Sequence, residues 1–365
     1  MSGRIGYLCL QATREGQASH AHVHGIVDGL RELGWEVDLH QPGYAESADD
    51  PGLWARLREF LRVQAGVIRV SGEYDALYVR SHFAAFPTVL YAKVREIPVV
   101  REVNGTYADL FIAWPWTRAL APLFRWVMRA QLRWSDTVIA VTEGLADWVR
   151  GEGAEGRIRV VSNAADVELF RSDRATETEL PDRFVIFFGA LAPWQGIETL
   201  LEAVHDPSWP EDVRLVVAGD GALRERVEEA TADGKVLYIG TVPYRNLPGV
   251  VTASLAGLSP QGNLAGRGDT GLHPLKVFET MACGVPVIVT DHPGQADLVR
   301  SVDCGIVVPP EDPPALAGAV ARLADDREAA RAMGARGRRA AVERHSWKRR
   351  AEETAAVLSE CLGEA

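Results

Sequence analysis

Short apolar runs alternate with amphipathic segments along this chain, and the alternation occurs twice. In the first series, runs that fit buried strands occupy 5–10, 36–39, 76–79, 99–102, 137–141 and 158–161. Segments that fit amphipathic helices lie at 20–33, 53–70, 117–133 and 144–150. Strands that alternate with helices in this way specify a parallel sheet with helices on both faces. The pattern therefore predicts an α/β fold.

A polar run at 171–182 interrupts the pattern, which then starts again. The second series of expected strands is 184–188, 214–218, 236–239, 255–259, 285–289 and 305–308, and terminal helices are expected at 327–344 and 346–362. The chain has 365 residues, of which 47% are hydrophobic, which suffices for two packed cores. We expect one domain over 1–170, a linker over 171–182, a second domain over 183–345 and a final helix within 346–365.

Composition and charge exclude several classes of protein. The net formal charge of −11 argues against nucleic acid as a partner, because binding a phosphate backbone needs a concentrated positive face. Cys9, Cys283, Cys304 and Cys361 are widely spaced, without a C-x-x-C pair, as in a reducing compartment. The first apolar run is too short for a signal peptide, and no stretch reaches the roughly 20 apolar residues that span a bilayer. A cytoplasmic location is expected.

The stretch 271–290 carries the strongest functional signal. Pro274 in the first turn and Gly284 after the last apolar residue predict a helix of about ten residues that leads into a buried strand. The free backbone N–H groups at the start of such a helix, together with Lys276, would bind a di-anionic phosphate. Glu279, one turn further on, could accept hydrogen bonds from the paired hydroxyls of a ribose. The sequence therefore predicts a nucleotide site.

The run from Lys276 through Glu279 to Gly284 resembles the donor-binding signature of the family-four glycosyltransferases. Further motifs follow in the family's order, at Gly16, His22–Val23, 136–145, 157–166, Phe188–Gly189, Gly196 and 217–221. The resemblance covers nearly the whole chain. It implies a GT-B fold, with an N-terminal acceptor-side and a C-terminal nucleotide-sugar-binding Rossmann-like domain facing across a cleft, and a last helix that crosses back to the first domain.

For function, the resemblance implies a retaining transfer of a sugar from a nucleotide-diphosphate donor to a hydroxyl of a glycan, a glycolipid or a small-molecule natural product. It implies neither a metal nor another cofactor. The residues that it places at the donor are Gly16, Gly189, Gln195, Gly196, Gly219, Arg267, His273, Pro274, Leu275, Lys276 and Glu279.

The chain departs from the family's pattern at three positions. Gly271 stands where the first Glu of the E-x7-E motif is usual, and the candidates to replace it are Asp269 and His273. The usual phosphate-binding Arg and Lys fall on Ala190 and Gln195, which leaves Lys276 and Arg267 to carry the positive charge. A subset of members shares the sequences Pro193–Trp194–Gln195–Gly196 and Pro274–Leu275–Lys276, so the departures fit variation within the family.

The histidines of the first-domain loop, 11–24, allow two interpretations. In the first, Gly16 brings backbone amides to the diphosphate while His20 or His22 faces the cleft. In the second, the histidines coat the first helix. The spacing of His20, His22 and His24 resembles that of metal ligands, but residues i and i+2 of a helix point apart, which argues against a metal site.

Arg80, Glu102 and Asn104 end two expected strands and are the remaining acceptor-side candidates. Many family members have His where Asn104 stands. Because Asn cannot take up a proton near neutral pH, Asn104 is not a general base. This suits a retaining reaction in which the departing phosphate accepts the proton. The alternative is a structural turn at Asn104–Gly105. The catalytic candidates are thus Lys276, Asn104 and His22.

The segment 114–134 combines tryptophans with a stripe formed by Arg118, Arg125, Arg129 and Arg133. The apolar residues Leu120, Leu123, Phe124, Val127 and Trp134 lie opposite this stripe on a helical wheel. A basic amphipathic helix suits peripheral contact with an anionic membrane and a lipid-linked acceptor. The same pattern describes a surface helix that packs its apolar side on the sheet, and we favour this second interpretation because it is the default for such helices.

Two other function classes remain as alternatives. One is another nucleotide-sugar enzyme on the same fold, such as an epimerase or a non-glycosidic coupling enzyme, for which Gly271 is the hint. The other is a non-catalytic nucleotide- or glycan-binding module, which the presence of both Lys276 and Glu279 disfavours.

Overall fold

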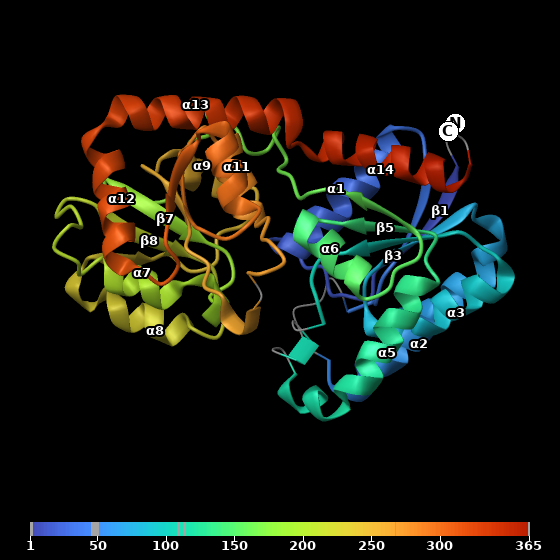
Figure 1. Ribbon diagram of the computed structural model, residues 1–365. Helices are drawn as coiled ribbons and strands as arrows, with labels where there is room; N and C mark the ends of the chain where they lie inside the picture. The colour runs from blue at the N-terminus through green and yellow to red at the C-terminus, as the bar shows by residue number, and fades with distance from the viewer. Residues whose placement is uncertain (1–2, 45–50, 108–109, 112–113, 267, 364–365) are drawn as a thin grey trace. The chain divides into compact units, whose positions relative to one another are not determined.

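The computed structural model describes residues 3–44, 51–107, 110–111, 114–266 and 268–363 (Figure 1). The chain divides into two compact units. Unit 1 comprises Met1–Ser162 and Trp347–Ala365, and unit 2 comprises Asn163–Ser346. The division at Ser162–Asn163 precedes the polar run 171–182, in which the sequence places the linker, so this run belongs to unit 2. The last helix, α14 (Trp347–Cys361), packs against α1 (Ala18–Glu32) within unit 1.

Unit 1 contains a parallel six-stranded sheet with the strand order β2-β1-β3-β4-β5-β6. The strands are β1 (Arg4–Leu8), β2 (Glu36–His40), β3 (Ala76–Arg80), β4 (Val99–Val103), β5 (Thr137–Ala140) and β6 (Arg157–Val160). All six coincide with expected strands, with ends that differ by one or two residues. The alternation of apolar and amphipathic segments therefore predicted this sheet correctly.

The helices of unit 1 cover both faces of its sheet. Helices α2 (Leu53–Val70), α3 (Phe86–Arg95) and α5 (Ala121–Arg133) lie on one face, and α1 and α14 lie on the other (Figure 1). The unit also contains α6 (Glu143–Gly151) and the short 3-10 helices η1 (Ser71–Glu73), η2 (Phe83–Ala85) and η3 (Pro115–Leu120).

Two helical segments of unit 1 differ from expectation. The single helix expected at 117–133 is split into η3 and α5, because Pro122 lies in the first turn of α5. Proline fits there, where its missing N–H is not needed, but would disrupt the interior of a longer helix. Helix α3 was not among the expected elements. It has Pro87 in its first turn and ends at Glu96 in a left-handed conformation, with φ 56°.

Unit 2 repeats the architecture, with a parallel sheet in the order β12-β11-β10-β7-β8-β9. Its strands are β7 (Phe184–Phe188), β8 (Arg214–Ala218), β9 (Val236–Tyr238), β10 (Gly257–Ser259), β11 (Val287–Thr290) and β12 (Gly305–Val308). Its helices are η4 (Pro193–Gln195), α7 (Ile197–Ala203), α8 (Arg224–Glu229), η5 (Ala230–Asp233), α9 (Leu247–Thr252), η6 (Leu264–Gly266), α10 (Leu275–Ala282), α11 (Gln295–Val302), α12 (Pro313–Asp325) and α13 (Arg327–Arg344).

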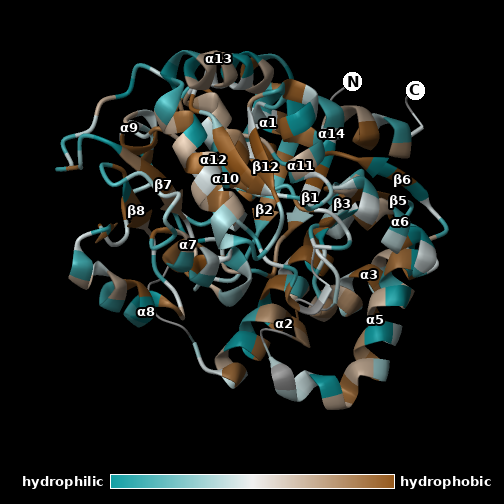
Figure 2. Ribbon diagram, turned by 60° about the vertical axis from the view of Figure 1, so that its left-hand side comes forward, coloured by the Kyte–Doolittle hydropathy of each residue, from teal (hydrophilic) through white to brown (hydrophobic). Residues whose placement is uncertain are grey.

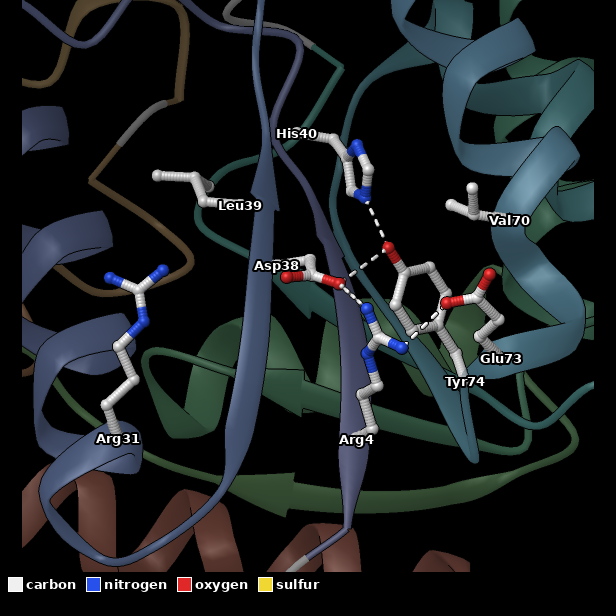
Figure 3. Close-up of a pocket in the computed structure, with 8 residues that line it drawn as sticks. All are labelled: Arg4, Arg31, Asp38, Leu39, His40, Val70, Glu73 and Tyr74. Carbon is white, nitrogen blue, oxygen red and sulfur yellow. Dashed lines mark hydrogen bonds and ion pairs between the residues drawn. The ribbon is translucent and has the colours of Figure 1, made fainter.

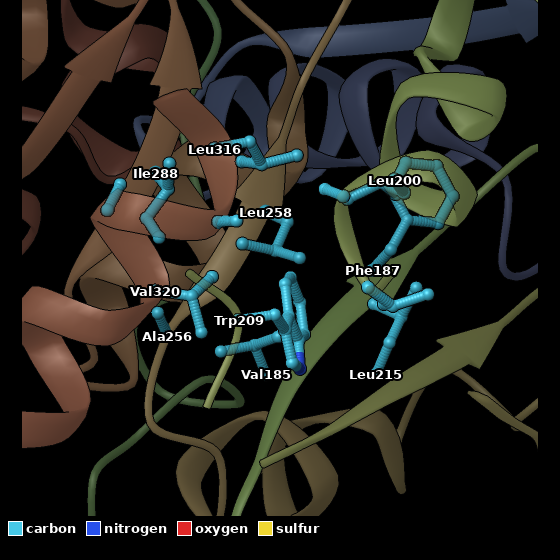
Figure 4. Close-up of a cluster of buried hydrophobic side chains, with 14 of the residues drawn as sticks. Val185, Phe187, Leu200, Trp209, Leu215, Ala256, Leu258, Ile288, Leu316 and Val320 are labelled. Atoms are coloured by element: carbon cyan, nitrogen blue, oxygen red, sulfur yellow. The ribbon is translucent and has the colours of Figure 1, made fainter. Parts of the chain in front are cut away.

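The central strand β7 shows how unit 2 buries both faces of its sheet. Val185 and Phe187 point into a core that includes Leu200 of α7 and Val320 of α12 (Figure 4). Neighbouring residues of a strand point to opposite faces, and Ile186 accordingly enters a second core, together with residues of α9, α10 and α13. A strand buried on both faces reads as a continuous apolar run, which is why β7 was predicted with its observed ends.

Helix α10 is shorter than expected and starts later. It spans eight residues, and Pro274 is its N-cap residue instead of lying in its first turn. The helix lies close against the sheet, because a Cβ atom on Gly257 of β10 would come within 2.4 Å of the Thr280 Oγ1 atom. Lys276 and Glu279 of this helix are buried.

Apolar residues are concentrated in the strands of both sheets (Figure 2). Within the described residues, no helix combines the length and the apolar character that crossing a membrane requires. The four cysteines are free thiols, as the sequence predicts.

Candidate functional site

The side chain of Lys276 is the centre of the candidate site in unit 2. It extends from the first turn of α10 and is only 8% exposed. Its Nζ atom donates a hydrogen bond to Gln195 Oε1 at 2.8 Å and lies 3.7 Å from the centroid of the Phe187 ring. A Cβ atom on Gly189 would lie 3.5 Å from the same Nζ atom. Three predicted donor residues, Gly189, Gln195 and Lys276, therefore meet at one point.

The surroundings of Lys276 disfavour its charge in the absence of a ligand. Burial lowers the pKa of its ammonium group to about 7, although Glu279 acts in the opposite direction. An anion placed beside the ammonium group would favour its charged form. The site is thus suited to an anionic group, such as a phosphate.

Glu279 lies one helical turn after Lys276 and is 5% exposed. It accepts a hydrogen bond of 2.7 Å from the hydroxyl of Tyr244, which is the one partner that the structure gives it among the described residues. Burial raises the pKa of Glu279 to about 7, despite this hydrogen bond. The carboxyl group therefore has remaining capacity to bind hydroxyl groups, as expected for a ribose site.

Tyr244 was not predicted as a site residue. Its ring packs against Phe170, with the ring centroids 5.3 Å apart, which fixes the hydroxyl toward Glu279. Phe187 was likewise predicted only as part of a strand. Both belong to segments far from α10 in the sequence, so no local pattern could have indicated their roles.

Two glycines allow the loops after β7 and β8 to touch beside Lys276. Gly189 and Gly219 have φ values of 122° and 139°, which side chains with a Cβ atom rarely adopt. A Cβ atom on Gly219 would lie 1.9 Å from the carbonyl oxygen of Gly189. Both loops follow the carboxyl ends of parallel strands, where α/β sheets bind ligands.

The predicted donor residues that precede α10 form a fixed loop. Asn163 Nδ2 donates to the carbonyl oxygen of His273 at 2.6 Å, and the His273 ring contacts Phe278, with the ring centroids 5.8 Å apart. Pro274 and Leu275 follow directly and start the helix. Asp269, the other candidate for the missing carboxylate, is exposed in the preceding turn and accepts a hydrogen bond from Asn263 at 2.9 Å.

Gly196 and Arg267 are two further predicted donor residues. Gly196 has φ 72°, and a Cβ atom there would lie 1.8 Å from the carbonyl oxygen of Pro260, so tight packing already requires glycine at this position. Arg267 lies outside the described residues.

In unit 1, Glu102 binds four other side chains. Its Oε2 atom accepts from the Tyr78 hydroxyl at 2.6 Å and lies 2.9 Å from His22 Nε2. Its Oε1 atom accepts from Asn104 Nδ2 at 2.5 Å and from the guanidinium group of Arg80. The two oxygens have about four acceptor positions in total, so this carboxylate is saturated.

This network keeps the Glu102 carboxyl group ionised. Burial by itself would raise the pKa of Glu102, but the pairing with His22 and Arg80 outweighs it, and the pKa lies well below its ordinary value. Glu102 and Arg80 are 1% and 7% exposed. Both side chains are therefore nearly withdrawn from solvent, and Glu102 holds His22 and Asn104 in place.

The side chains of the three histidines of α1 do not form a single cluster. The rings of His20 and His24 lie 4.1 Å apart, whereas His22 turns to Glu102 and to Trp347, whose ring lies 5.2 Å away. In the described ranges, no three His, Cys, Asp or Glu side chains are arranged to hold a metal ion. Gly16 precedes the helix with φ 86°, and a Cβ atom there would meet open space, so the left-handed backbone is what requires glycine.

A separate hollow of about 500 Å³ lies at the edge strand β2 (Figure 3). Its polar side chains other than Arg31 pair with one another. Arg4 binds Asp38 at 2.9 Å and Glu73 at 2.7 Å, and Tyr74 donates to Asp38 at 3.0 Å. None of the predicted site residues lines this hollow.

Comparisons with known proteins identify the family of this chain. Residues 19–169 match the family model "Glycosyltransferase Family 4", and residues 170–340 match "Glycosyl transferases group 1". The chain is 27% identical over 293 residues to the alpha-D-kanosaminyltransferase of Streptomyces kanamyceticus, covering 76% of this chain and 73% of the relative.

Two solved structures show the same fold. Sucrose-phosphate synthase from Thermosynechococcus elongatus has a TM-score of 0.80 and 18% identity, with 100% of both chains covered. HepE of Anabaena in complex with UDP-glucose has a TM-score of 0.71 and 16% identity, with 98% of this chain and 100% of that chain covered. The two consecutive family matches, together with this fold, show that the chain belongs to the group 1 and family-four glycosyltransferases of the GT-B fold.

Proposed function

We propose that this protein transfers a sugar, with retention of its anomeric configuration, from a nucleotide-diphosphate donor to a hydroxyl acceptor. The observation that carries the proposal is the buried ammonium group of Lys276, in the first turn of α10 and beside the Gly189 loop, with Glu279 one turn further on. The name of the kanosaminyltransferase relative and the UDP-glucose bound to HepE support a nucleotide-sugar donor.

In this proposal, the diphosphate binds at the start of α10 and beside Lys276. The backbone N–H groups of a helix start and the ammonium group both favour an anion. As the bond to the sugar breaks, negative charge grows on the departing diphosphate, and fixed positive groups stabilise this charge in the transition state. Lys276 takes the part that a metal ion has in other transferases, so no metal is required.

Glu279 would hold the ribose. Its carboxyl group has one hydrogen-bond partner among the described residues, Tyr244, and can accept bonds from the paired hydroxyls. Tyr244 orients the carboxyl group for that contact.

On the acceptor side, the structure offers little support for a dedicated base built on Glu102 or Asn104. Asn104 cannot take up a proton, and the lone pairs of Glu102 are already engaged. We infer that the departing phosphate accepts the proton of the attacking hydroxyl, as suits a retaining front-face reaction. His22 and Asn104, both held by Glu102, would orient the reacting groups.

Metal-free nucleotide binding is tested by thermal denaturation with EDTA present. A nucleoside diphosphate at a hundredfold excess over its dissociation constant should stabilise the protein by about 2.7 kcal/mol. A shift in melting temperature that requires magnesium or manganese would contradict the proposed role of Lys276.

Retention is tested by NMR spectroscopy of the first-formed product. The anomeric proton should keep the coupling that it has in the donor, and an inverted coupling would overturn the mechanism. Product analysis with a labelled donor also separates transfer from epimerisation, because only transfer joins the label to the acceptor.

A further inference from the structure

Most of the exposed apolar surface of this protein lies on one side of unit 1. The described residues include 14 exposed large apolar side chains, and 11 of them belong to α2, α3 and the segment 114–126. These 11 are Leu53, Trp54, Leu57, Leu61, Leu90, Val94, Trp114, Trp116, Leu120, Leu123 and Trp126. Four of the ten tryptophans of the chain are among them. We call the outer face of α2, α3, η3 and α5 the tryptophan face.

The elements of the tryptophan face are in contact with one another. Helix α3 packs against both α2 and α5 (Figures 1 and 2). The guanidinium group of Arg56 in α2 lies over the Trp114 ring, 5.5 Å from its centroid, and the Phe86 ring of α3 lies 5.6 Å from that of Trp126 in α5. The exposed apolar side chains therefore belong to helical segments that are in contact with one another.

The structure corrects the predicted orientation of α5. The sequence suggested that Leu120 and Leu123 would pack on the sheet, but they are 47% and 54% exposed, as is Trp126 at 57%. The buried residues of α5 are Met128, Gln131 and Leu132, and Gln131 Oε1 accepts a hydrogen bond of 2.7 Å from the buried Arg101. This polar anchor holds the second half of α5 on the sheet, so the first half presents its apolar residues outward.

Positive charge is concentrated on the same segments. Residues 53–70, 86–95 and 114–134 contain ten Lys and Arg but a single acidic residue, Glu59, which gives a balance of +9. The whole chain has 39 Lys and Arg against 50 Asp and Glu, so the rest of it carries 29 against 49, a balance of −20. Charges farther away than about 10 Å are largely screened at 0.1 M salt, so an anionic surface would encounter mainly the local positive charge.

Large exposed apolar patches mark docking sites, and tryptophan together with arginine is typical of proteins that lie at a lipid interface. We propose that the tryptophan face docks on an anionic membrane surface. The net positive charge of these segments favours anionic lipid headgroups, although Arg62 and Arg129 already pair with Glu59 and Glu152. The exposed Trp and Leu side chains enter the boundary between headgroups and acyl chains. This inference goes beyond sugar transfer and does not depend on it, because docking is measured without a donor.

The test measures binding of the full chain to phosphatidylcholine vesicles with and without phosphatidylglycerol. The wild-type protein should bind the anionic vesicles, release them at high salt and show a blue shift of tryptophan fluorescence. Trp54→Ser and Trp126→Ser should each weaken binding about tenfold, because each removes a buried aromatic side chain. Arg58→Gln and Arg118→Gln should each weaken it about fivefold.

Matched controls come from unit 2. Val342→Ser removes an apolar side chain that is 45% exposed, and Arg331→Gln removes an exposed charge of α13, and both should leave vesicle binding unchanged. Circular dichroism and the melting temperature of each variant verify that it is folded, without involving a nucleotide or a vesicle.

Two outcomes would overturn the proposal. The first is that the wild-type protein does not bind anionic vesicles, or that all four variants of the tryptophan face bind like the wild type. The second is that the wild-type protein forms a dimer and does not bind vesicles, and that Trp54→Ser or Trp126→Ser converts this dimer to a monomer. That result would make the tryptophan face a contact between two copies of the chain. Either result leaves the proposed sugar transfer untouched.

Discussion

Glu102 in unit 1 and Glu279 in unit 2 are both buried carboxyl groups, but their surroundings shift their pKa values in opposite directions. Glu102 is bound by His22, Tyr78, Arg80 and Asn104, and its pKa is lowered. Glu279 has Tyr244 as its hydrogen-bond partner, and burial raises its pKa to about 7. The number of donors around each group accounts for the difference.

The comparison separates two uses of buried charge. The Glu102 network is complete without a ligand, so it fixes the positions of other side chains. At Glu279 and Lys276, burial works against the charged form of both groups, and the bound ligand would supply the missing interactions. A buried charge with few partners is therefore a better indicator of a binding site than a buried charge with many.

The largest expected effect is the loss of stability on Glu102→Gln. The substitution leaves the buried Arg80 without its carboxylate partner, and breaking a buried ion pair from one side costs about 3–5 kcal/mol. Urea denaturation of the two proteins measures the change in the free energy of unfolding. Glu36→Gln is the control, because the Glu36 side chain is 78% exposed, and it should change stability by less than about 0.5 kcal/mol. Equal effects of the two substitutions would show that the Glu102 network is not structural.

Lys276→Met should have the next largest effect, and it should act on binding instead of folding. Removing one charge-assisted contact should weaken nucleoside diphosphate binding by about 1.5–3 kcal/mol. The free energy of unfolding at neutral pH should not fall, since the buried ammonium group is replaced by an apolar group of similar length. Isothermal titration calorimetry measures the affinity, with Lys235→Met as the control. Unchanged affinity in Lys276→Met would show that the phosphates bind elsewhere.

Glu279→Gln should make the protein more stable at alkaline pH, in contrast to Glu102→Gln. With its pKa raised from 4.5 to about 7, Glu279 contributes stability that is fully present below about pH 4.5 and is lost as the pH rises through 7. The glutamine variant does not ionise, so at about pH 8.5 it should exceed the wild type by up to about 3 kcal/mol, with little difference at about pH 4.5. Urea denaturation at both pH values measures this.

The same variant tests the ribose assignment. Glu279→Gln should weaken the binding of nucleosides but leave the binding of pyrophosphate unchanged, because pyrophosphate lacks the hydroxyls that Glu279 would hold. An equal loss of affinity for both probes would remove Glu279 from the ribose site.

The smallest expected effect is on the pH dependence of nucleoside diphosphate binding. Because the pKa of Lys276 lies at about 7 without a ligand, the ammonium form that binds phosphate is lost as the pH rises through 7. Nucleoside diphosphate affinity should fall by up to about tenfold per pH unit above that point. In Lys276→Arg the affinity should be nearly independent of pH over the same range, since Arg stays charged. Identical pH profiles of the two proteins would contradict the inferred titration of Lys276.

The sequence predicted the arrangement around Lys276 only in part. The helix start, the lysine and the glutamate one turn later follow from the local order of residues, and the structure contains all three. Gln195 was expected at the donor site, but its bond to Lys276 joins residues 81 positions apart. Tyr244 is 35 positions from Glu279, and nothing in its neighbourhood marks it as a partner. Such pairs form only when separate loops meet at the end of a sheet.

The sequence by itself determined the strands that the structure describes in the two parallel sheets. Most of them are buried on both faces and appear as short apolar runs, and the edge strands β2 and β6 were recognised from their place in the alternation of strands and helices. The tertiary structure decided which polar groups are saturated and which faces are exposed. Glu102 is saturated because four donors from separate segments converge on it. Leu123 of α5 is exposed, whereas Gln131 at the other end of the helix is buried and bonded to Arg101. The spacing of apolar residues and the secondary-structure propensity of a segment are local properties. The burial of a polar group and the number of its hydrogen bonds depend on the whole fold.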